Sequence, residues 1–350
     1  MTAQLSQFAA RLRLDGALPH REFNERALEL FGLQFEHNPA YRKICEGRRR
    51  IPASPGHWTQ IPFVPTAAFK EWDLSGIPPE ARTGVFHSSG TTEQKPSRHF
   101  HSPDSLNLYE TALWASFRKN VIEPPVNYDL LVLTPPPELV PHSSLVHMFK
   151  TIQRKLGALE PVYAGDIAAD GAWVLDFAAA LAALENGSGP KLILGTAFSF
   201  VHLLDFLADK NRRLHLPAQS RVMETGGYKN RSRTMPKAAL HSLITRHLGV
   251  LRENIICEYG MSELSSQAYD SNPERHFHFP SWTRAQIISP ETGAEMADGE
   301  TGLIRIFDLA NVFSVAAIQT EDLAVRRGDG FELLGRAALA EPRGCSLMTA

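Results

Sequence analysis

Residues 191–209 read KLILGTAFSFVHLLDFLAD and contain two patterns in succession. The run Lys191–Gly195 is short and almost entirely apolar, as expected of a strand that is covered on both faces. Phe198–Asp209 has the length and the amphipathic character of a helix. A buried strand that leads into such a helix is the repeating unit of a parallel sheet. The segment therefore predicts an α/β fold in which parallel strands are flanked by helices.

The same alternation occurs on both sides of this segment. Upstream, we expect a strand at Asp129–Leu133 and a helix at Ser143–Leu156. Downstream, we expect strands at Arg221–Glu224 and Asn254–Glu258, joined by a helix at Arg231–His247. In open α/β sheets, ligands bind beyond the carboxyl ends of the strands. The turns that follow these strands are therefore the expected place of a binding site.

After about residue 280 the pattern changes to short β-prone runs. We expect strands at Ala285–Ser289, Gly302–Phe307 and Val312–Gln319. Turn signals at Thr292-Gly293 and Asp298-Gly299 separate them. This part of the chain predicts a small β subdomain, antiparallel or barrel-like.

Composition excludes several classes of protein. The 36 Lys and Arg residues nearly balance 38 Asp and Glu, so no broad field attracts nucleic acid or an anionic membrane. The longest apolar run, Val174–Leu184, contains Asp176 and is too short to span a bilayer, and we expect a cytoplasmic protein. The three cysteines lack C-x-x-C spacing, and His276 and His278 lack an evident third ligand. Disulfides and a transition-metal site are not expected.

The segment His87–Ser97, HSSGTTEQKPS, contains the strongest signal for chemistry. Its hydroxyls, backbone amides and one ammonium group could surround a polyphosphate. It is not a Walker P-loop, because the G-x-x-x-x-G-K-[ST] pattern is absent. A serine- and threonine-rich surface turn is the alternative, and the loop alone leaves both interpretations open.

Four segments in order resemble the motifs of the adenylate-forming superfamily, which includes acyl-CoA synthetases and nonribosomal peptide adenylation domains. They are Ser88-Ser89-Gly90-Thr91-Thr92 with Lys95-Pro96, Thr225-Gly226-Gly227, Tyr259-Gly260-Met261-Ser262-Glu263, and Thr320-Glu321-Asp322 followed by Leu334-Gly335-Arg336. The resemblance implies that ATP and Mg²⁺ bind here. The residues it implies for ATP are Ser88, Ser89, Gly90, Thr91, Thr92, Lys95, Gly226, Gly227, Tyr259, Gly260, Asp322 and Arg336.

The resemblance also assigns roles to single residues. Gly226 and Gly227 would let the backbone lie against adenine, and Tyr259 would stack on it. Asp322 and Arg336 would lie at the ribose. In the same motifs, Ser262 would contact the α-phosphate or the acyl carboxylate, and Glu263 would bind magnesium, which takes oxygen ligands.

Within this superfamily the chain resembles the acyl-protein synthetases of the LuxE type, from the fatty-acid reductase of luminescent bacteria. Gly226-Gly227-Tyr228-Lys229 and Arg343-Gly344-Cys345-Ser346-Leu347 carry this resemblance. It implies activation of a long-chain fatty acid to an acyl-adenylate, followed by a thioester on Cys345. The acyl group would then pass to a partner such as a reductase subunit, so the enzyme would be a long-chain-fatty-acid–protein ligase.

The two other cysteines have less suitable surroundings. Cys257 lies in an apolar strand and Cys45 on a predicted helix, where a cysteine is usually a core residue. Arg343 could lower the pKa of the Cys345 thiol and favour the nucleophilic thiolate. The opposing interpretation of Cys345 is an idle cysteine in a frayed tail.

The chain departs from the superfamily after Arg336, where typical members continue into a small domain that supplies an adenylation lysine. Only fourteen residues follow Arg336, and we expect that domain to be largely absent. Lys229 is the first candidate to replace the lysine, Lys95 is the second, and a partner surface is the third possibility. We expect a helical region at 1–60, the adenylate-forming large domain at 61–336 and a short tail at 337–350.

Two other functions stay open. The acyl group could pass to coenzyme A or an acyl-carrier thiol, which would leave Cys345 uninvolved. Alternatively, the chain could bind nucleotide without catalysis. The acyl chain length, the acceptor and the oligomeric state are not predicted from these residues.

Overall fold

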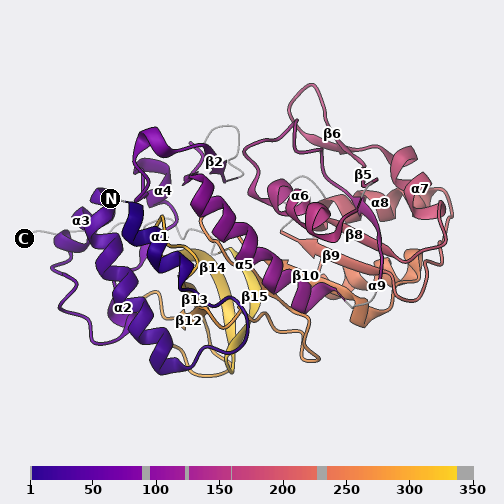
Figure 1. The fold of residues 1–350 in the computed structure, drawn as a ribbon. Coiled ribbons are helices and arrows are strands. Elements are labelled where there is room, and N and C mark those ends of the chain that lie inside the picture. Colours follow the sequence, from indigo (N-terminus) through magenta and orange to yellow (C-terminus); the bar gives the residue numbers. More distant parts are fainter. Residues whose placement is uncertain (1, 89–94, 123–125, 159, 227–234, 337–350) are drawn as a thin grey trace, which may run out of the picture.

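The structure is a computed structural model, and it describes residues 2–88, 95–122, 126–158, 160–226 and 235–336. These residues form two main sheets. The helices α1 to α3 lie beside one of them, and α6 to α9 lie around the other (Figure 1). The described helix α5, Pro103–Val121, runs between the two halves. Its Leu108 and Ala112 belong to one core, whereas Leu113 and Phe117 belong to another.

The larger sheet has six strands in the order β11-β10-β9-β8-β4-β5. Five of them run parallel, and only β11 pairs antiparallel with its neighbour β10. The strands are β4 Asp129–Val132, β5 Val162–Tyr163, β8 Lys191–Thr196, β9 Arg221–Thr225, β10 Ile255–Tyr259 and β11 Ala268–Tyr269. The predicted parallel strands are therefore confirmed, with shifts of one residue at several ends.

Helices cover both faces of this sheet. Successive strand residues point to opposite sides, so each strand contributes side chains to both helical layers. In β8, Ile193 belongs to the core beneath α7, α8 and α9, whereas Leu192 and Leu194 belong to the core beneath α5 and α6. These helices are α6 Ser144–Leu156, α7 Phe177–Glu185, α8 Ala197–Asp209 and α9 Lys237–Leu248. Burial on both faces explains why the strand sequence is continuously apolar rather than alternating.

The second sheet contains β1 Val64–Pro65, β12 Thr283–Ile288, β13 Thr301–Asp308, β14 Ala317–Arg327 and β15 Gly330–Arg336. The strands β12 to β15 pair antiparallel in sequence order, and β1 joins parallel to β14. The predicted turn glycines Gly293 and Gly299 both lie in the connection between β12 and β13. This sheet is the predicted small β subdomain.

The N-terminal helices share a core with the second sheet. They are α1 Thr2–Ala10, α2 His20–His37 and α3 Pro39–Gly47. The ring of Phe23 packs edge-on against Phe307 of β13, with centroids 6.0 Å apart. Buried Gln34 donates to the carbonyls of Asn311 and Val312. A domain boundary at residue 60 stays a prediction.

Two predicted elements need correction. Val312–Gln319 was expected to be a strand, but β14 begins only at Ala317, and the residues before it form a buried loop. The side chain of Gln34 accepts a hydrogen bond from the Ala316 amide, so a residue of helix α2 rather than a neighbouring strand binds this N–H group. The helix expected from Arg231 begins in the described residues at Lys237, directly after Pro236, a residue that favours helix starts.

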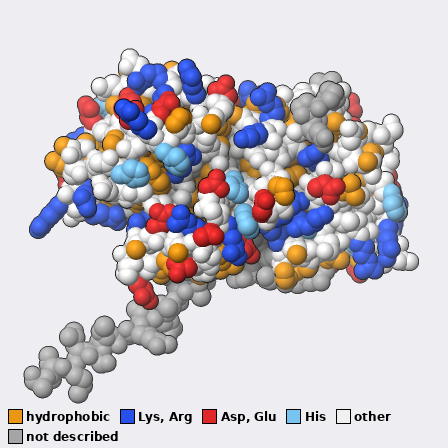
Figure 2. Space-filling view, turned by 90° about the horizontal axis from the view of Figure 1, so that it is seen from below, with side chains coloured by type: hydrophobic (Ala, Val, Ile, Leu, Met, Phe, Trp, Pro, Cys, Tyr) orange, Lys and Arg blue, Asp and Glu red, His pale blue; other side chains and the backbone are white. Residues whose placement is uncertain are grey.

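The remaining described elements are short. They are β2 Gly84–His87, β3 Arg98–His101, β6 Gly165–Ile167, β7 Trp173–Leu175, the helix α4 Ala68–Glu71 and three 3₁₀ turns. No helix among the described ranges has the length and apolar character needed to cross a membrane. Figure 2 shows basic and acidic side chains interspersed over the face in view.

Candidate active site

The loop predicted to bind phosphate connects β2 to β3, two antiparallel strands. Its base is closed by two hydrogen bonds between Ser88 and Ser97. The Ser97 amide donates to Ser88 Oγ at 3.0 Å, and the Ser88 amide donates to the Ser97 carbonyl at 3.4 Å. The predicted residues Ser89, Gly90, Thr91 and Thr92 lie outside the described residues. Lys95 is exposed, with Nζ 3.6 Å from Glu71 Oε2.

The base of this loop contacts Glu263 directly. Ser97 Oγ donates to Glu263 Oε1 at 2.5 Å, and Ser262 Oγ donates to Glu263 Oε2 at 2.9 Å. Asn311 Nδ2 holds the Glu263 carbonyl at 2.8 Å. The three hydrogen-bonded side chains of Ser97, Ser262 and Glu263 are buried. The fold thus joins two of the predicted motifs, which are far apart in the sequence.

The chemistry of this cluster suits magnesium on a nucleotide. Carboxylate and hydroxyl oxygens are the hard ligands that magnesium takes. Among the described residues, no three His, Cys, Asp or Glu side chains are grouped closely enough to hold a metal ion. Magnesium usually binds proteins through one or two carboxylates and completes its shell with water and substrate phosphates. The single carboxylate of Glu263 fits that mode of binding.

The predicted adenine-binding turns lie at the ends of two neighbouring strands. Thr225 ends β9 and Tyr259 ends β10, and the two strands are parallel. Gly226 has a φ of +73°, a left-handed conformation that favours glycine. A Cβ on Gly260 would collide with the Glu258 carboxylate. Gly227 and Lys229 lie outside the described residues.

Tyr259, Asp322 and Arg336 come together in the structure, and their roles in nucleotide binding stay predictions. The Tyr259 hydroxyl donates to Asp322 Oδ2 at 2.8 Å, and Arg336 Nε lies 3.8 Å from Asp322 Oδ1. Burial raises the pKa of Asp322, and the Tyr259 hydrogen bond and Arg336 oppose that rise. The Tyr259 ring packs against Phe331, with centroids 5.4 Å apart, and only 6% of the residue is exposed.

Two residues at the site escaped the sequence analysis. Glu258 is buried and accepts a hydrogen bond from Thr225 Oγ1. Burial raises the pKa of Glu258 to about 7, the Thr225 hydrogen bond opposes this, and nearby Glu224 adds to it. The available signal was a carboxylate in the otherwise apolar segment Ile255–Tyr259.

His99 is the second residue that was missed, because the histidines were considered only as metal ligands. Burial lowers its pKa to about 4, and hydrogen bonds with the backbone of Ser262 and Glu263 oppose that change. Its ring stacks on His101, with centroids 4.8 Å apart and an interplanar angle of 4°. The buried imidazole of β3 therefore lies beside the loop that carries Glu263.

Comparison with known proteins identifies the family of the chain. The sequence model of the family described as acyl-protein synthetase, LuxE, matches residues 145–350. The chain belongs to this family. Membership confirms the predicted class of enzyme, an acid–thiol ligase.

Similar proteins with curated names extend the match along the chain. It is 23% identical over 337 residues to a long-chain-fatty-acid–luciferin-component ligase of Aliivibrio fischeri, covering 92% of this chain and 86% of that protein. The protein of the same name from Vibrio harveyi is 21% identical, covering 89% and 83%. Both matches reach well beyond the residues that the family model covers.

Solved structures confirm the fold. An open conformation of 2-hydroxyisobutyryl-CoA ligase superposes with a TM-score of 0.71 at 13% identity, covering 91% of this chain and 71% of that one. A long-chain-fatty-acid–CoA ligase from Archaeoglobus fulgidus gives a TM-score of 0.52 at 15% identity, covering 72% and 51%. The adenylate-forming α/β fold of this LuxE-family protein is therefore as predicted.

The two described cysteines of the LuxE-family chain are core residues, as expected. Cys45 on α3 is fully buried, and burial raises the pKa of its thiol to about 11. Burial also raises the pKa of the Cys257 thiol on β10 well above its ordinary value. Neither is a thiolate near neutral pH, the form needed for attack on an acyl group. Cys345 lies outside the described residues.

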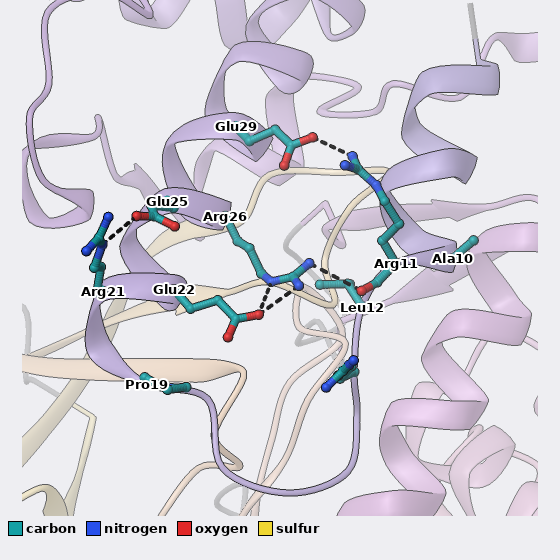
Figure 3. Close-up of a pocket in the computed structure, with 10 residues that line it drawn as sticks. Ala10, Arg11, Leu12, Pro19, Arg21, Glu22, Glu25, Arg26 and Glu29 are labelled. Atoms are coloured by element: carbon teal, nitrogen blue, oxygen red, sulfur yellow. Dashed lines mark hydrogen bonds and ion pairs between the residues drawn. The ribbon is translucent and has the colours of Figure 1, made fainter.

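A large surface hollow of this LuxE-family protein lies elsewhere. It measures about 890 Å³ and is lined by residues of α1, α2 and their connection (Figure 3). Its charged side chains pair with one another, including Arg21 Nε with Glu25 Oε1 at 2.9 Å and Arg26 Nη2 with Glu22 Oε1 at 2.8 Å. None of the predicted site residues lines it, so its size does not make it the active site.

Proposed function

We propose that this protein uses ATP and Mg²⁺ to activate a long-chain fatty acid as its acyl-adenylate. The acyl group then forms a thioester with Cys345 and passes to a partner protein. One observation carries the first part of the proposal. Ser97 joins the base of the phosphate loop to Glu263, so a metal ion on Glu263 and a nucleotide phosphate on the loop would be neighbours.

The first step joins the fatty acid to the nucleotide. A carboxylate oxygen attacks the α-phosphorus, and the bond between that phosphorus and the pyrophosphate oxygen breaks. Ser88, Ser89, Gly90, Thr91, Thr92 and Lys95 would hold the departing phosphates. Ser262 and Glu263 lie against the loop base, where Ser262 would orient the α-phosphate or the acyl carboxylate. Magnesium on Glu263 would balance the negative charge of the phosphates.

The nucleoside would lie at the ends of β9 and β10. Gly226 and Gly227 would let the backbone lie against the base, and Asp322 would accept hydrogen bonds from the ribose hydroxyls. The buried Tyr259 hydroxyl already orients the Asp322 carboxylate. Arg336 is exposed beside it and can contact the nucleotide from the solvent side.

The lysine of the adenylation step remains to be assigned. Lys229 is our first candidate, because it follows the glycine pair at the end of β9. Lys95 is the second candidate, since its exposed pair with Glu71 contributes little free energy and does not hold the ammonium group in place. An unimpaired adenylation rate in a Lys229→Ala variant would remove Lys229 from consideration.

The second step forms the thioester. The Cys345 thiolate attacks the acyl carbon, the bond to the adenylate oxygen breaks, and AMP leaves. The names of the relatives support a fatty acid as substrate and an acyl-accepting protein as partner, since both contain fatty acid and luciferin component. A reductase subunit is the partner that we propose.

The test combines two measurements on the same samples. The protein is incubated with ATP, magnesium and a radiolabelled long-chain fatty acid, and pyrophosphate release and hydroxylamine-sensitive label on the protein are measured. We expect both in the wild type and only pyrophosphate release in Cys345→Ala. Cys45→Ala is the matched control, because it removes a buried thiol and should keep the label. Pyrophosphate release without label in the wild type would indicate an external thiol, and neither activity would indicate a nucleotide-binding protein.

A further inference from the structure

The carboxylate of Glu263 is held at both oxygens by neutral donors. Ser97 binds Oε1 and Ser262 binds Oε2. Two hydroxyls fix the orientation of the carboxylate without neutralising its charge. Each carboxylate oxygen has two lone pairs, so one on each oxygen stays available for a cation. The arrangement is that of a metal ligand that is oriented before the metal arrives.

The two hydroxyls come from different parts of the chain. Ser262 is the direct neighbour of Glu263, and its position follows from the local backbone. Ser97 lies at the end of the phosphate loop, and its backbone forms both hydrogen bonds with Ser88 that close the loop base. The Ser97 side chain therefore connects the loop to the carboxylate, whereas its backbone closes the loop.

A second contact from the same segment supports this connection. Ser97 directly precedes β3, His99 lies within it two residues later, and both side chains are buried. The buried His99 side chain lies beside the backbone of Ser262 and Glu263, which opposes the lowering of its pKa. The ring of Phe69 stacks with that of His99, with centroids 6.3 Å apart. The contact between β3 and the Glu263 loop is thus built from several groups rather than one.

We propose that Ser97 is a positioning residue that orients Glu263 for magnesium and couples the phosphate loop to the metal site. This inference rests on the proposed ATP-dependent adenylation. Groups that hydrogen-bond to a metal-coordinating residue orient it, and their loss lowers the affinity for the metal about 10-fold to 100-fold. Ser97 would act on the nucleotide only through the metal, because its loop contacts are made by the backbone.

The test separates the side chain from the backbone. Ser97→Ala removes only the hydroxyl on Glu263 and keeps both hydrogen bonds to Ser88 that its own backbone makes. We would measure binding of the Mn²⁺–ATP complex from the loss of the free Mn²⁺ signal in electron paramagnetic resonance. Metal-free ATP binding would be measured in EDTA. Ser97→Ala should weaken Mn²⁺–ATP binding about 10-fold and leave metal-free ATP binding unchanged.

Three further variants control this experiment. Ser97→Thr keeps the hydroxyl and should restore most of the Mn²⁺–ATP affinity. Ser116→Ala removes the hydroxyl of a different buried serine on α5 and should bind as the wild type does. If Ser97→Ala does not fold, as judged from its thermal unfolding, Ser97→Cys replaces it, because the thiol fills the same space and is a weak donor.

The outcomes distinguish this inference from the proposed function. Wild-type affinity for Mn²⁺–ATP in Ser97→Ala, or an equal loss with and without metal, would overturn the role of Ser97 while leaving adenylation intact. Weakened Mn²⁺–ATP binding in a protein that releases no pyrophosphate with fatty acid would support Ser97 and contradict adenylation. A wild type that does not bind Mn²⁺–ATP would overturn both.

Discussion

Two clusters bring distant motif residues together at this site, and they differ in how firmly they are held. The cluster of Ser97, Ser262 and Glu263 is buried, and both carboxylate oxygens have hydroxyl donors. The cluster of Tyr259, Asp322 and Arg336 runs from a buried tyrosine to an arginine whose side chain is 81% exposed. The first is arranged before ligand binds, whereas the second has one end free to adjust. Stabilising charge on the reacting phosphates, the role that we propose for the first cluster, needs groups fixed in advance. Binding of the ribose, the role that we propose for the second cluster, tolerates a side chain that moves.

The largest effect should follow from changing the carboxylate of the buried cluster. Glu263→Gln keeps the shape of the side chain, and one of the two serine hydroxyls can accept from the new amide NH2 instead of donating. It removes the charge that we propose binds magnesium. Metal stabilisation of a transition state is worth several kcal/mol, so we expect pyrophosphate release to fall about 100-fold or more. Thermal unfolding should be close to that of the wild type. A fall of less than about threefold in the rate of pyrophosphate release would mean that this cluster has only a structural role.

The buried carboxylate of Glu258 should make the stability of the protein depend on pH. The pKa of Glu258 is about 7 in the folded protein against an ordinary value of 4.5, so the folded state binds this proton more tightly than the unfolded state. The contribution of the protonated Glu258 to the free energy of unfolding is therefore complete below about pH 4.5 and is lost as the pH rises through 7. Glu258→Gln does not titrate. Its free energy of unfolding relative to the wild type should rise by about 3 kcal/mol between pH 4.5 and 8.

Denaturant unfolding of both proteins across this pH range checks the prediction. Glu253→Gln on the 3₁₀ turn before β10 is a control for removal of a nearby carboxylate. A constant difference between Glu258→Gln and wild type would show that Glu258 carries no shifted proton.

We propose that Tyr259, Asp322 and Arg336 bind the ribose, and we call them the ribose cluster. A change in this cluster should mainly alter the binding of ATP. Asp322→Asn keeps an acceptor for the Tyr259 hydroxyl but loses the charge that strengthens hydrogen bonds to a sugar. Hydrogen bonds to charged groups contribute about 1.5–3 kcal/mol, so the KM for ATP should rise about 10-fold or more with little change in kcat. Initial rates of pyrophosphate release over a range of ATP concentrations measure both. A fall in kcat alone would place Asp322 with the reacting groups instead.

The smallest effect is expected at the exposed end of that cluster. Arg336 Nε lies 3.8 Å from Asp322 Oδ1, and exposed ion pairs contribute about 0–1 kcal/mol. Arg336→Ala should leave thermal unfolding unchanged and raise the KM for ATP by no more than about fivefold. A larger rise would show that the arginine closes on bound nucleotide, and the ribose cluster would then be as ordered as the buried one once ATP is present.

Much of the fold was predictable because it depends on local patterns. The apolar runs at β4, β8, β9 and β10 are strands in the structure, with ends that differ by one residue at most positions. The wrong strand at Val312–Ala316 shows the limit of this reasoning. Those residues are apolar because α2 and the loops around them bury them, and burial by a helix leaves the same apolar signal as burial in a sheet.

The sequence by itself determined the motifs, their order and hence the family of the chain, because these are properties of short segments. It also singled out Lys229 and Cys345, which stay predictions. Only the tertiary structure decided that Ser97 contacts Glu263 across 166 positions, that burial raises the pKa of Glu258 to about 7 and that buried His99 lies beside the same loop. The physical reason is that burial and hydrogen-bond partners set the role of a polar side chain, and both come from residues that are remote in the chain.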